Sequence, residues 1–383
     1  MQNQDAIQIK KLKLADLPLL RDFFLAAYGS ATVFQEVEFL KWYFFDQAGL
    51  ADKAAGSIFA LDTDQNKIVS FYGGLSSEME VNNYKVPLIW GVNAFTLPAY
   101  RGMGLNKKLI SEVIKETTTH AVIGFTPKAA AFYKQLEYNL FDNQRFARFV
   151  FVLYPDKVKA VQKHLNFNSG FNFSQQVNSA VFSRSEEKFI TRLTTAGLAK
   201  TELDFACQVA VTTHRSKEFI RSRFLENPFI GYHVFAFGYG NKMSAYIACR
   251  AEALEPTGVT AYRVIDLYGT QNGVTNLLRF IIKKAAEYGH AYLDFSVFGT
   301  MYDNVFQSLG FSKLQNDEYA LLPQVSAPVE HRPNLEYAGI KSSAFSSVFQ
   351  QLTIHDVYFT RSDSDRDRIA RISQLPEKQL AGE

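Results

Sequence analysis

Residues 95–106 read FTLPAYRGMGLN and join an apolar stretch to a segment with helical periodicity. Gly102 and Gly104 leave backbone N–H groups accessible at the start of that helix, and Lys107 and Lys108 add positive charge just inside it. A helix start of this kind binds phosphate through its unpaired N–H groups and its dipole. A strand-to-helix turn that needs glycine only for its shape explains the same pattern, so the spacing leaves both interpretations open.

The chain has 383 residues, of which 47% are hydrophobic and 21% are charged, and its formal net charge is +3. This length favours two domains, and the composition is that of a folded protein. The small net charge and the lack of a basic run argue against a nucleic-acid partner. Cys207 and Cys249 lie far apart without metal-ligand spacing, which predicts a reducing compartment and no metal site.

No apolar leader and no apolar stretch long enough to span a membrane stand out in the sequence. We therefore expect a cytoplasmic protein. The pattern indicates no particular oligomeric state.

The first 154 residues alternate helical and extended patterns at short intervals. The patterns predict a strand from residue 7, helices from residues 17 and 34, and extended segments at 57–61, 67–80 and 84–97. After the glycine motif they predict a helix with one apolar stripe at 105–114, a strand at 121–125, a helix at 128–138 and a strand at 145–154.

A stretch rich in Asn, Ser and Gln at residues 166–185 indicates a domain boundary. We assign residues 1–160 to an N-terminal domain, residues 161–185 to a linker and residues 186–383 to a C-terminal domain.

The order of patterns then returns in the second half. THAVIGF at 119–125 is echoed by GHAYLDF at 289–295, and KWYFFD near the start of the first half by SRFLEN at 222–227. An internal duplication is the economical explanation, with chance similarity of short segments as the alternative.

The stretch LPAYRGMGLNKKLI resembles motif A of the GCN5-related N-acetyltransferase (GNAT) superfamily. The family pattern is Arg or Gln, two residues, Gly, one residue, then Gly or Ala. Pro98, Tyr100, Arg101 and Gly104 match it, whereas Asn106 occupies the last small position.

Further along, Thr126, Ala129 and Tyr133 stand where family members carry Asn, Ala and Tyr. The resemblance covers the first 154 residues. It implies an α+β protein of two GNAT-like domains, each a mixed, mostly antiparallel twisted sheet flanked by helices.

The resemblance also implies acyl transfer from acetyl-coenzyme A (acetyl-CoA). In similar proteins the diphosphate lies on backbone N–H groups of the motif, and the pantetheine arm pairs with the preceding strand. A backbone N–H of that strand would stabilise the oxyanion, and Tyr133 would protonate the leaving thiolate. The alternative for Tyr133 is an aromatic core residue. The implied cofactor-binding residues are Ala94, Phe95, Thr96, Arg101, Gly102, Met103, Gly104, Leu105, Asn106, Lys107 and Thr126.

The sequence does not single out a general base. Asn93 occupies the strand position where family members often carry Glu or Asp, and an amide cannot accept the proton. Glu78, Glu80 and His120 are candidates, each with a surface or strand-end role as the alternative.

The second half lacks the motif. It reads DLYGTQNGVTNLL at residues 266–278, without a preceding Arg, and Phe306 replaces the helical Tyr. We expect no second cofactor site there, and we expect this domain to form a wall on the acceptor side.

The charged stretch YFTRSDSDRDR at residues 358–368 is typical of a solvated tail. A loop whose arginines bind a sugar phosphate is the more specific alternative. This ending also resembles those of tandem acetyltransferase-like proteins in bacterial surface-polysaccharide gene sets, which points to an amino sugar.

These observations predict a transferase that moves an acetyl group from acetyl-CoA to a primary amine of a small acceptor, with an amino sugar as one candidate. A non-catalytic CoA- or ligand-binding protein that keeps the fold is an alternative, favoured by Asn106 and Thr126. An aminoacyl-tRNA-dependent peptidyl transferase is a third hypothesis, and the absence of a run of basic residues argues against it.

Overall fold

The computed structural model describes residues 6–47, 56–125, 127–141, 146–164, 184–205, 209–314, 322–323 and 337–375. The chain forms two compact units that are interleaved along the sequence. Unit 1 consists of Met1–Asp142, Ala338–Leu352 and Arg368–Glu383, and unit 2 of Asn143–Tyr337 and Thr353–Asp367.

These units differ from the sequence-based domains at four places. Residues 143–160, which we assigned to the N-terminal domain, belong to unit 2. Residues 338–352 and 368–383, which we assigned to the C-terminal domain, belong to unit 1. Residues 161–164 of the expected linker end a helix, and residues 165–183 lie outside the described part of the chain.

Unit 1 contains a sheet with the strand order β1-β2-β3-β4-β5-β15. Its strands are β1 (Ile7–Lys11), β2 (Ile58–Asp62), β3 (Lys67–Val81), β4 (Tyr84–Thr96), β5 (Thr119–Phe125) and β15 (Tyr337–Ser342). Neighbours from β1 to β4 are antiparallel, whereas β4 and β5 are parallel. Asn82 and Asn83, with φ of 49° and 69°, form the two-residue turn between β3 and β4, because asparagine tolerates the left-handed conformation that such hairpins need.

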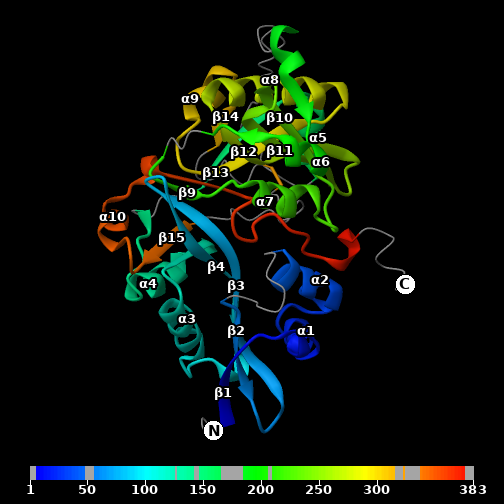
Figure 1. Ribbon diagram of the computed structural model, residues 1–383. Coiled ribbons are helices and arrows are strands. Elements are labelled where there is room, and N and C mark those ends of the chain that lie inside the picture. The colour runs from blue at the N-terminus through cyan, green and yellow to red at the C-terminus, as the bar shows by residue number, and fades with distance from the viewer. Residues whose placement is uncertain are drawn as a thin grey trace. The chain divides into compact units, whose positions relative to one another are not determined.

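Helices cover both faces of the unit 1 sheet (Figure 1). They are α1 (Leu17–Tyr28), α2 (Val37–Lys41) with the π-helical turn η4 (Trp42–Asp46), α3 (Leu105–Glu116), α4 (Pro127–Gln135) and α10 (Ser346–Gln351). In Figure 1, α1 and α2 lie on one side of β2–β4, and α3 and α4 lie on the other. The predicted apolar stripe of α3 is buried, at Leu105, Leu109, Ile110 and Val113.

Unit 2 repeats the order of unit 1, in which a short helix and a π-helical turn precede three antiparallel strands, a helix, a parallel strand and a helix. The repeated elements are α7 (Lys217–Ile220), η9 (Arg221–Leu225), β10 (His233–Tyr239), β11 (Lys242–Leu254), β12 (Val259–Gly269), α8 (Gln271–Glu287), β13 (Tyr292–Phe298) and α9 (Asp303–Ser308). β13 begins at Tyr292, so the echoed heptapeptides at 119–125 and 289–295 lie three residues out of register with the strands they suggested.

Further elements complete unit 2. These are β6 (Ala147–Val152), α5 (Pro155–His164), β7 (Ile190–Arg192), α6 (Thr195–Lys200), β8 (Glu202–Leu203), β9 (Val211–Thr213), β14 (Ser312–Leu314) and β16 (Val357–Thr360). Each unit thus has a mixed, mostly antiparallel sheet flanked by helices, and the fold class predicted from the sequence is confirmed. No helix in the described residues is long and apolar enough to cross a membrane.

Strand β6 follows helix α4 of unit 1 in the sequence but pairs with β13 of unit 2. A buried ion cluster fixes this pairing. Asp294 on β13 accepts from Arg148 on β6 at 2.5 Å and from Arg263 on β12 at 2.8 Å, and all three side chains are at most 2% exposed. Burial opposes the charge of Asp294, but the two guanidinium groups lower the pKa of its carboxyl below the ordinary value.

Replacing Asp294 by Asn should destabilise the protein strongly. The change leaves two buried guanidinium groups without their counter-charge, and breaking a buried pair in this way costs about 3–5 kcal/mol of the free energy of unfolding. Urea denaturation measures the loss. Glu112→Gln, which removes an exposed pair with Lys115, is the control and should cost less than about 1 kcal/mol. Equal losses in both variants would contradict a structural role for the cluster.

Candidate functional site

Helix α3 starts without a side-chain cap. Its N-cap residue is Gly104 in the left-handed conformation, with φ of 70°, and among the described residues no side chain caps the first turn. Gly102 also has a positive φ, of 86°, and a Cβ atom at either glycine would meet nothing within 4 Å. The loop therefore needs glycine for its backbone conformation, and the space beside it is open.

The first turn of α3 offers unpaired polar groups. The first intrahelical hydrogen bond runs from Lys108 N to Gly104 O at 3.1 Å, so the N–H groups of Leu105, Asn106 and Lys107 have no acceptor within the helix. The side-chain Oδ1 of Asn106 is buried and has no hydrogen-bond partner among the described residues. Lys107 is exposed, Leu105 is buried and Met103 is half-buried.

Strands β4 and β5 diverge beside this helix start. Their parallel pairing covers only Ile89–Gly91 with His120–Val122, although β4 continues to Thr96. Among the described residues, no strand pairs with Ala94–Thr96 on the side that faces β5. We call this place the fork of unit 1, and its open edge can pair with an extended ligand.

Arg101 folds back on the end of β4. Its Nε donates to Thr96 O at 3.3 Å, and its guanidinium lies 5.5 Å from the centre of the Phe95 ring. Ala94 is exposed, whereas Phe95 and Thr96 are half-buried. The structure therefore brings the predicted residues of the strand and of the glycine loop together. Thr126, also predicted, lies outside the described residues.

The corresponding fork of unit 2 is closed by the chain itself. β12 pairs with β13 only at Tyr262–Val264, and β16 then takes over the edge of β13 at Val297 and Phe298. Side chains join β16 to β12, since Thr360 Oγ1 donates to Asp266 at 2.8 Å and the Tyr358 hydroxyl donates to the carbonyl of Leu267.

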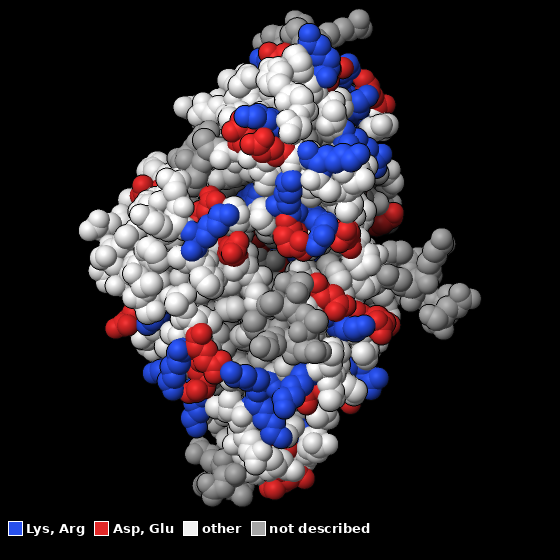
Figure 2. Space-filling view, viewed as in Figure 1, with Lys and Arg blue, Asp and Glu red and all other residues white. Residues whose placement is uncertain are grey.

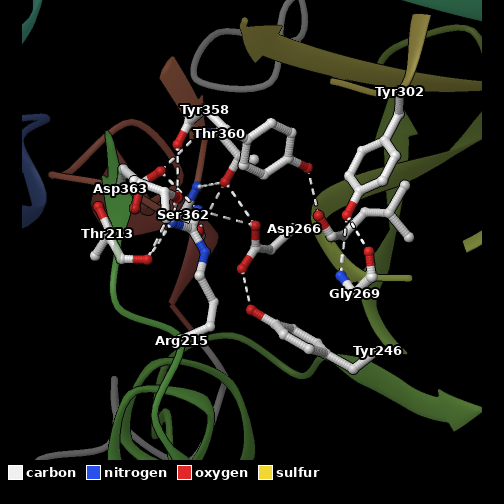
Figure 3. Close-up of polar contacts among 12 residues, drawn as sticks. Thr213, Arg215, Tyr246, Asp266, Gly269, Tyr302, Tyr358, Thr360, Ser362 and Asp363 are labelled. Atoms are coloured by element: carbon white, nitrogen blue, oxygen red, sulfur yellow. Dashed lines mark hydrogen bonds and ion pairs between the residues drawn. The ribbon is translucent and has the colours of Figure 1, made fainter. Parts of the chain in front are cut away.

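An ion network holds β16 in the closed fork (Figure 3). The fully buried Arg215 donates to Asp363 at 2.8 Å and to Asp266 at 3.3 Å. Asp367 accepts from Tyr232 at 2.6 Å and from Arg250 at 2.9 Å. The interpretation of residues 358–368 as a solvated tail is therefore wrong, because its aspartates find buried partners that are distant in the sequence.

Helix α8 also starts differently from α3. It begins at Gln271, directly after Thr270, whose hydroxyl accepts a hydrogen bond from Gly273 N at 3.3 Å. Unit 2 therefore has neither the glycine loop nor the uncapped first turn. The helix start that is uncapped in unit 1 is capped in unit 2, and the fork that is open in unit 1 is closed in unit 2.

Tyr133 lies at the fork of unit 1. It is 7% exposed, and its ring packs against Phe125 at 4.8 Å. The hydroxyl of Tyr72 reaches Gly91 in the last pair of the β4–β5 ladder and lies 3.1 Å from His120 Nε2. Burial raises the pKa of Tyr133 to about 12, and the side chain of Tyr72 acts in the opposite direction.

The candidate bases from the sequence do not face the fork directly. His120 is 1% exposed, its ring nitrogens contact the hydroxyls of Tyr72 and Tyr138, and burial lowers its pKa to about 3. Glu78 and Glu80 lie toward the β3–β4 turn, opposite Pro87 and Lys85. Glu80 is six residues beyond Gly74, the partner of Gly91, which places it about 20 Å along the strand.

Strand β4 carries an irregularity one step past the fork. Asn93 adopts a positive φ of 51° where the β3–β4 register shifts, and its Nδ2 donates to the Tyr43 hydroxyl at 3.2 Å. Tyr43 is 1% exposed, whereas Trp42 is half-buried. A kink of this kind turns backbone N–H groups away from the ladder.

A cavity of about 700 Å³ in unit 1 lies elsewhere. Its lining includes Val113, Glu116 and Thr118, at and just after the C-terminal end of α3, together with Lys11 and Pro87. The glycine loop lies at the opposite end of that 12-residue helix, about 18 Å away. This cavity is therefore separate from the fork.

Charges of both signs are mixed over the face of the molecule shown in Figure 2. Lys and Arg side chains alternate there with Asp and Glu side chains. That face thus presents no band of one sign to a polyanion.

No family model and no curated protein sequence matches the chain. Solved structures do match it. N-myristoyltransferase from Saccharomyces cerevisiae with bound myristoyl-CoA has a TM-score of 0.55 at 9% identity, covering 89% of this chain and 83% of that one. A probable N-acyltransferase from Enterococcus faecalis V583 has a TM-score of 0.54 at 11% identity, covering 88% and 72%.

A GCN5-related N-acetyltransferase from Kribbella flavida has a TM-score of 0.53 at 10% identity, covering 91% of this chain and 74% of that one. At these identities the likeness shows the fold alone. The chain has a GNAT-like fold, as the resemblance of its glycine motif predicted.

His120 should make the stability of the protein depend on pH. Between pH 6.5, the ordinary histidine pKa, and pH 3 the unfolded chain binds a proton there that the folded chain does not, so stability falls as pH is lowered through this window. At pH 5 this contribution is about 2 kcal/mol. Urea denaturation at pH 7.5 and pH 5 should show a smaller acid loss for His120→Asn than for the wild type. An equal loss would contradict a buried neutral imidazole.

Proposed function

We propose that unit 1 binds acetyl-CoA at the start of α3 and the open fork, and transfers the acetyl group to a primary amine of a small acceptor. The observation that carries this proposal is the combination of an uncapped helix start with an unpaired strand edge in unit 1. Unit 2 has the same order of elements, but its helix start is capped and its fork is filled by β16. This difference supports duplication followed by loss of one site.

The residues at the fork fit CoA. The N–H groups of residues 102–107 and the positive end of α3 suit the diphosphate, with Lys107 adding charge. The free edge at Ala94–Thr96 suits the extended pantetheine arm, whose amides can pair with a strand. Asn106 Oδ1 is an acceptor still in need of a donor, and CoA carries N–H and O–H donors.

Bound acetyl-CoA supplies an activated acyl group as a thioester. In the proposed reaction the backbone N–H groups of β4 near Asn93 stabilise the charge that develops on the carbonyl oxygen. Tyr133 donates its hydroxyl proton to the departing thiolate sulfur. The apolar rings around Tyr133 exclude water from this transfer.

The choice of acetyl donor and amine acceptor rests on the resemblance of the glycine motif. The solved structures of this fold include proteins named for myristoyl and for acetyl transfer, so a donor series from acetyl-CoA to myristoyl-CoA tests the acyl length. The amino-sugar acceptor rests on the resemblance of residues 358–368 to the endings of tandem acetyltransferase-like proteins in bacterial surface-polysaccharide gene sets, and the sugar phosphate rests on the arginines of this stretch. Arg361 there is 1% exposed, so this stretch no longer supports a sugar phosphate site.

Replacing Gly104 by Ala should weaken CoA binding by at least about tenfold, because the left-handed N-cap conformation resists a side chain and the added methyl enters the open space. Isothermal titration calorimetry measures the affinity and should give one CoA per chain for the wild type.

The control is Gly240→Ala, because Gly240 has a similar φ of 63° and equally open surroundings, but in unit 2. It should cost similar stability and leave CoA affinity unchanged. Equal affinities of all three proteins, or two CoA per chain, would contradict the proposed site.

Turnover with an amine panel tests the reaction itself. Amino-sugar nucleotides, amino acids and polyamines serve as acceptors, with release of free CoA thiol as the readout. Tyr133→Phe should lower kcat about 10²-fold with the best acceptor, since it removes the proton donor. CoA binding by the wild type without turnover on any amine would favour a non-catalytic binding protein.

A further inference from the structure

The turn that follows helix α4 is held by a strand from a distant part of the sequence, since β15 and α10 lie beside α4 (Figure 1). Lys341 on β15 donates from Nζ to the carbonyl oxygen of Leu136 at 2.7 Å and lies 3.1 Å from Glu137 Oε2. Carbonyl groups at the end of a helix lack donors within it, and the helix dipole favours a cation there. The side chain of Glu137 is 86% exposed, so the contact with the Leu136 carbonyl is the stronger of the two.

This turn closes on Tyr133. The backbone N–H groups of Leu136 and Tyr138 both donate to the carbonyl oxygen of Tyr133, each at 3.1 Å. Glu137 between them adopts the left-handed conformation, with φ of 62°, as is common where a helix ends. The residue whose carbonyl Lys341 binds is thus itself bonded to Tyr133. A shift of the turn would move the backbone of Tyr133 with it.

Strand β15 also binds the residues directly after the turn. Asn139 and Ile340 exchange two backbone hydrogen bonds, at 2.8 and 3.0 Å, and Asn139 Nδ2 donates to the carbonyl of Phe349 in α10. Because β15 lies next to β5 in the sheet, these contacts tie the end of α4 to the sheet.

A further contact of β15 reaches the ring of Tyr133 through Phe125. A Cβ atom on residue 339 would lie 2.8 Å from Leu140 Cδ2 and 3.6 Å from Phe125 Cε1, so Gly339 lets β15 pack closely against both side chains. The Phe125 ring lies 4.8 Å from that of Tyr133. The segment around Lys341 therefore supports Tyr133 at its backbone and at its ring.

We propose that Lys341 is a positioning residue, which holds the end of α4 so that the Tyr133 hydroxyl stays in place to protonate the leaving thiolate. This inference rests on the proposed function. In that step the carbon–sulfur bond breaks with its electron pair on sulfur, and the proton of the Tyr133 hydroxyl passes to sulfur. The proton released by the acylated amine restores Tyr133 through solvent, so none is consumed overall.

The position of Lys341 separates catalysis from cofactor binding. Among the described residues, no hydrogen bond joins residues 338–341 to residues 94–107, which form the end of β4 and the glycine loop. A displaced Tyr133 should therefore slow the reaction and leave CoA binding unchanged, because a misplacement of about 1 Å costs up to about 10²-fold in rate. Residues 338–352 come after most of unit 2 in the sequence, so the site of unit 1 is incomplete without a segment from the end of the chain.

The test is Lys341→Met in the full-length chain. Loss of the contact with Leu136 should lower kcat about tenfold or more, while the KM for acetyl-CoA stays within about twofold. Lys341→Arg keeps the charge and the N–H donors and should keep kcat within about threefold of the wild type. The matched control is Lys217→Met, which removes a lysine that donates to the carbonyl of Ala199 at the end of α6 in unit 2, at 3.2 Å, and should leave kcat unchanged.

A double-mutant cycle shows whether Lys341 acts through Tyr133. In a Tyr133→Phe background, Lys341→Met should lower kcat no further, because the proton donor is already missing. A wild-type kcat for Lys341→Met, or an equal loss in both backgrounds, would overturn this inference and leave the proposed function standing. Lys341→Gln, a milder change, takes the place of Lys341→Met if that variant does not fold.

Two other outcomes concern the proposed function itself. If Tyr133→Phe keeps the wild-type rate, the role of Tyr133 and the role of Lys341 fail together. If the wild type turns over no amine, the proposed function fails and the inference fails with it.

A measurement that needs no turnover then judges the positioning alone. ¹³C NMR of protein labelled at tyrosine Cζ, with Tyr133→Phe for assignment, should show the Tyr133 resonance shifted in Lys341→Met and unchanged in Lys217→Met. An unchanged Tyr133 resonance in Lys341→Met would overturn the inference even if the wild type acetylates an amine.

Discussion

Backbone groups exposed where two parallel strands diverge constrain both units of this protein. A strand that leaves its neighbour exposes N–H and C=O groups, which need partners wherever they are buried. In unit 2 the fork is buried, and β16 supplies the partners by pairing with β13. In unit 1 the fork reaches the surface at Ala94, so water or a ligand can supply them. Unit 2 therefore completes this strand edge with its own chain, whereas unit 1 leaves the edge available to a ligand.

Buried ion pairs close the fork of unit 2 together with the backbone pairing. Arg215, Asp266 and Asp363 bring three distant stretches of the chain to one point, since Asp266 lies 51 positions after Arg215 and Asp363 lies 148 positions after it. The cluster of Asp294 similarly joins β6 to β13 across 146 residues. Buried ion pairs contribute little net stability compared with apolar packing, but a wrong partner would leave a charge unpaired. Both clusters therefore specify which strand enters which sheet.

Local elements were predictable where a pattern acts within a few residues. The apolar stripe of α3 follows from helical periodicity and is confirmed, and the Asn82–Asn83 turn follows from a local φ requirement. The unit boundaries were not predictable in the same way. The sequence of β6 indicates a strand, but an extended pattern does not say which sheet receives it. The charged stretch at 358–368 resembled a surface segment for the same reason, since its partners lie elsewhere in the chain.

The sequence by itself determined the shape of the helix start, because Gly102 and Gly104 act through their own backbone conformation and need no distant contact. The resemblance of the residues after the motif to the GNAT pattern also pointed to Tyr133. Only the tertiary structure decided that Tyr72, His120 and Tyr138 form a buried line of hydrogen bonds. Tyr72 and His120 are 48 residues apart, and their contact depends on the missing side chain of Gly91 on the strand between them. Hydrogen bonds of this kind depend on packing across a sheet, and no periodic pattern along the chain predicts them.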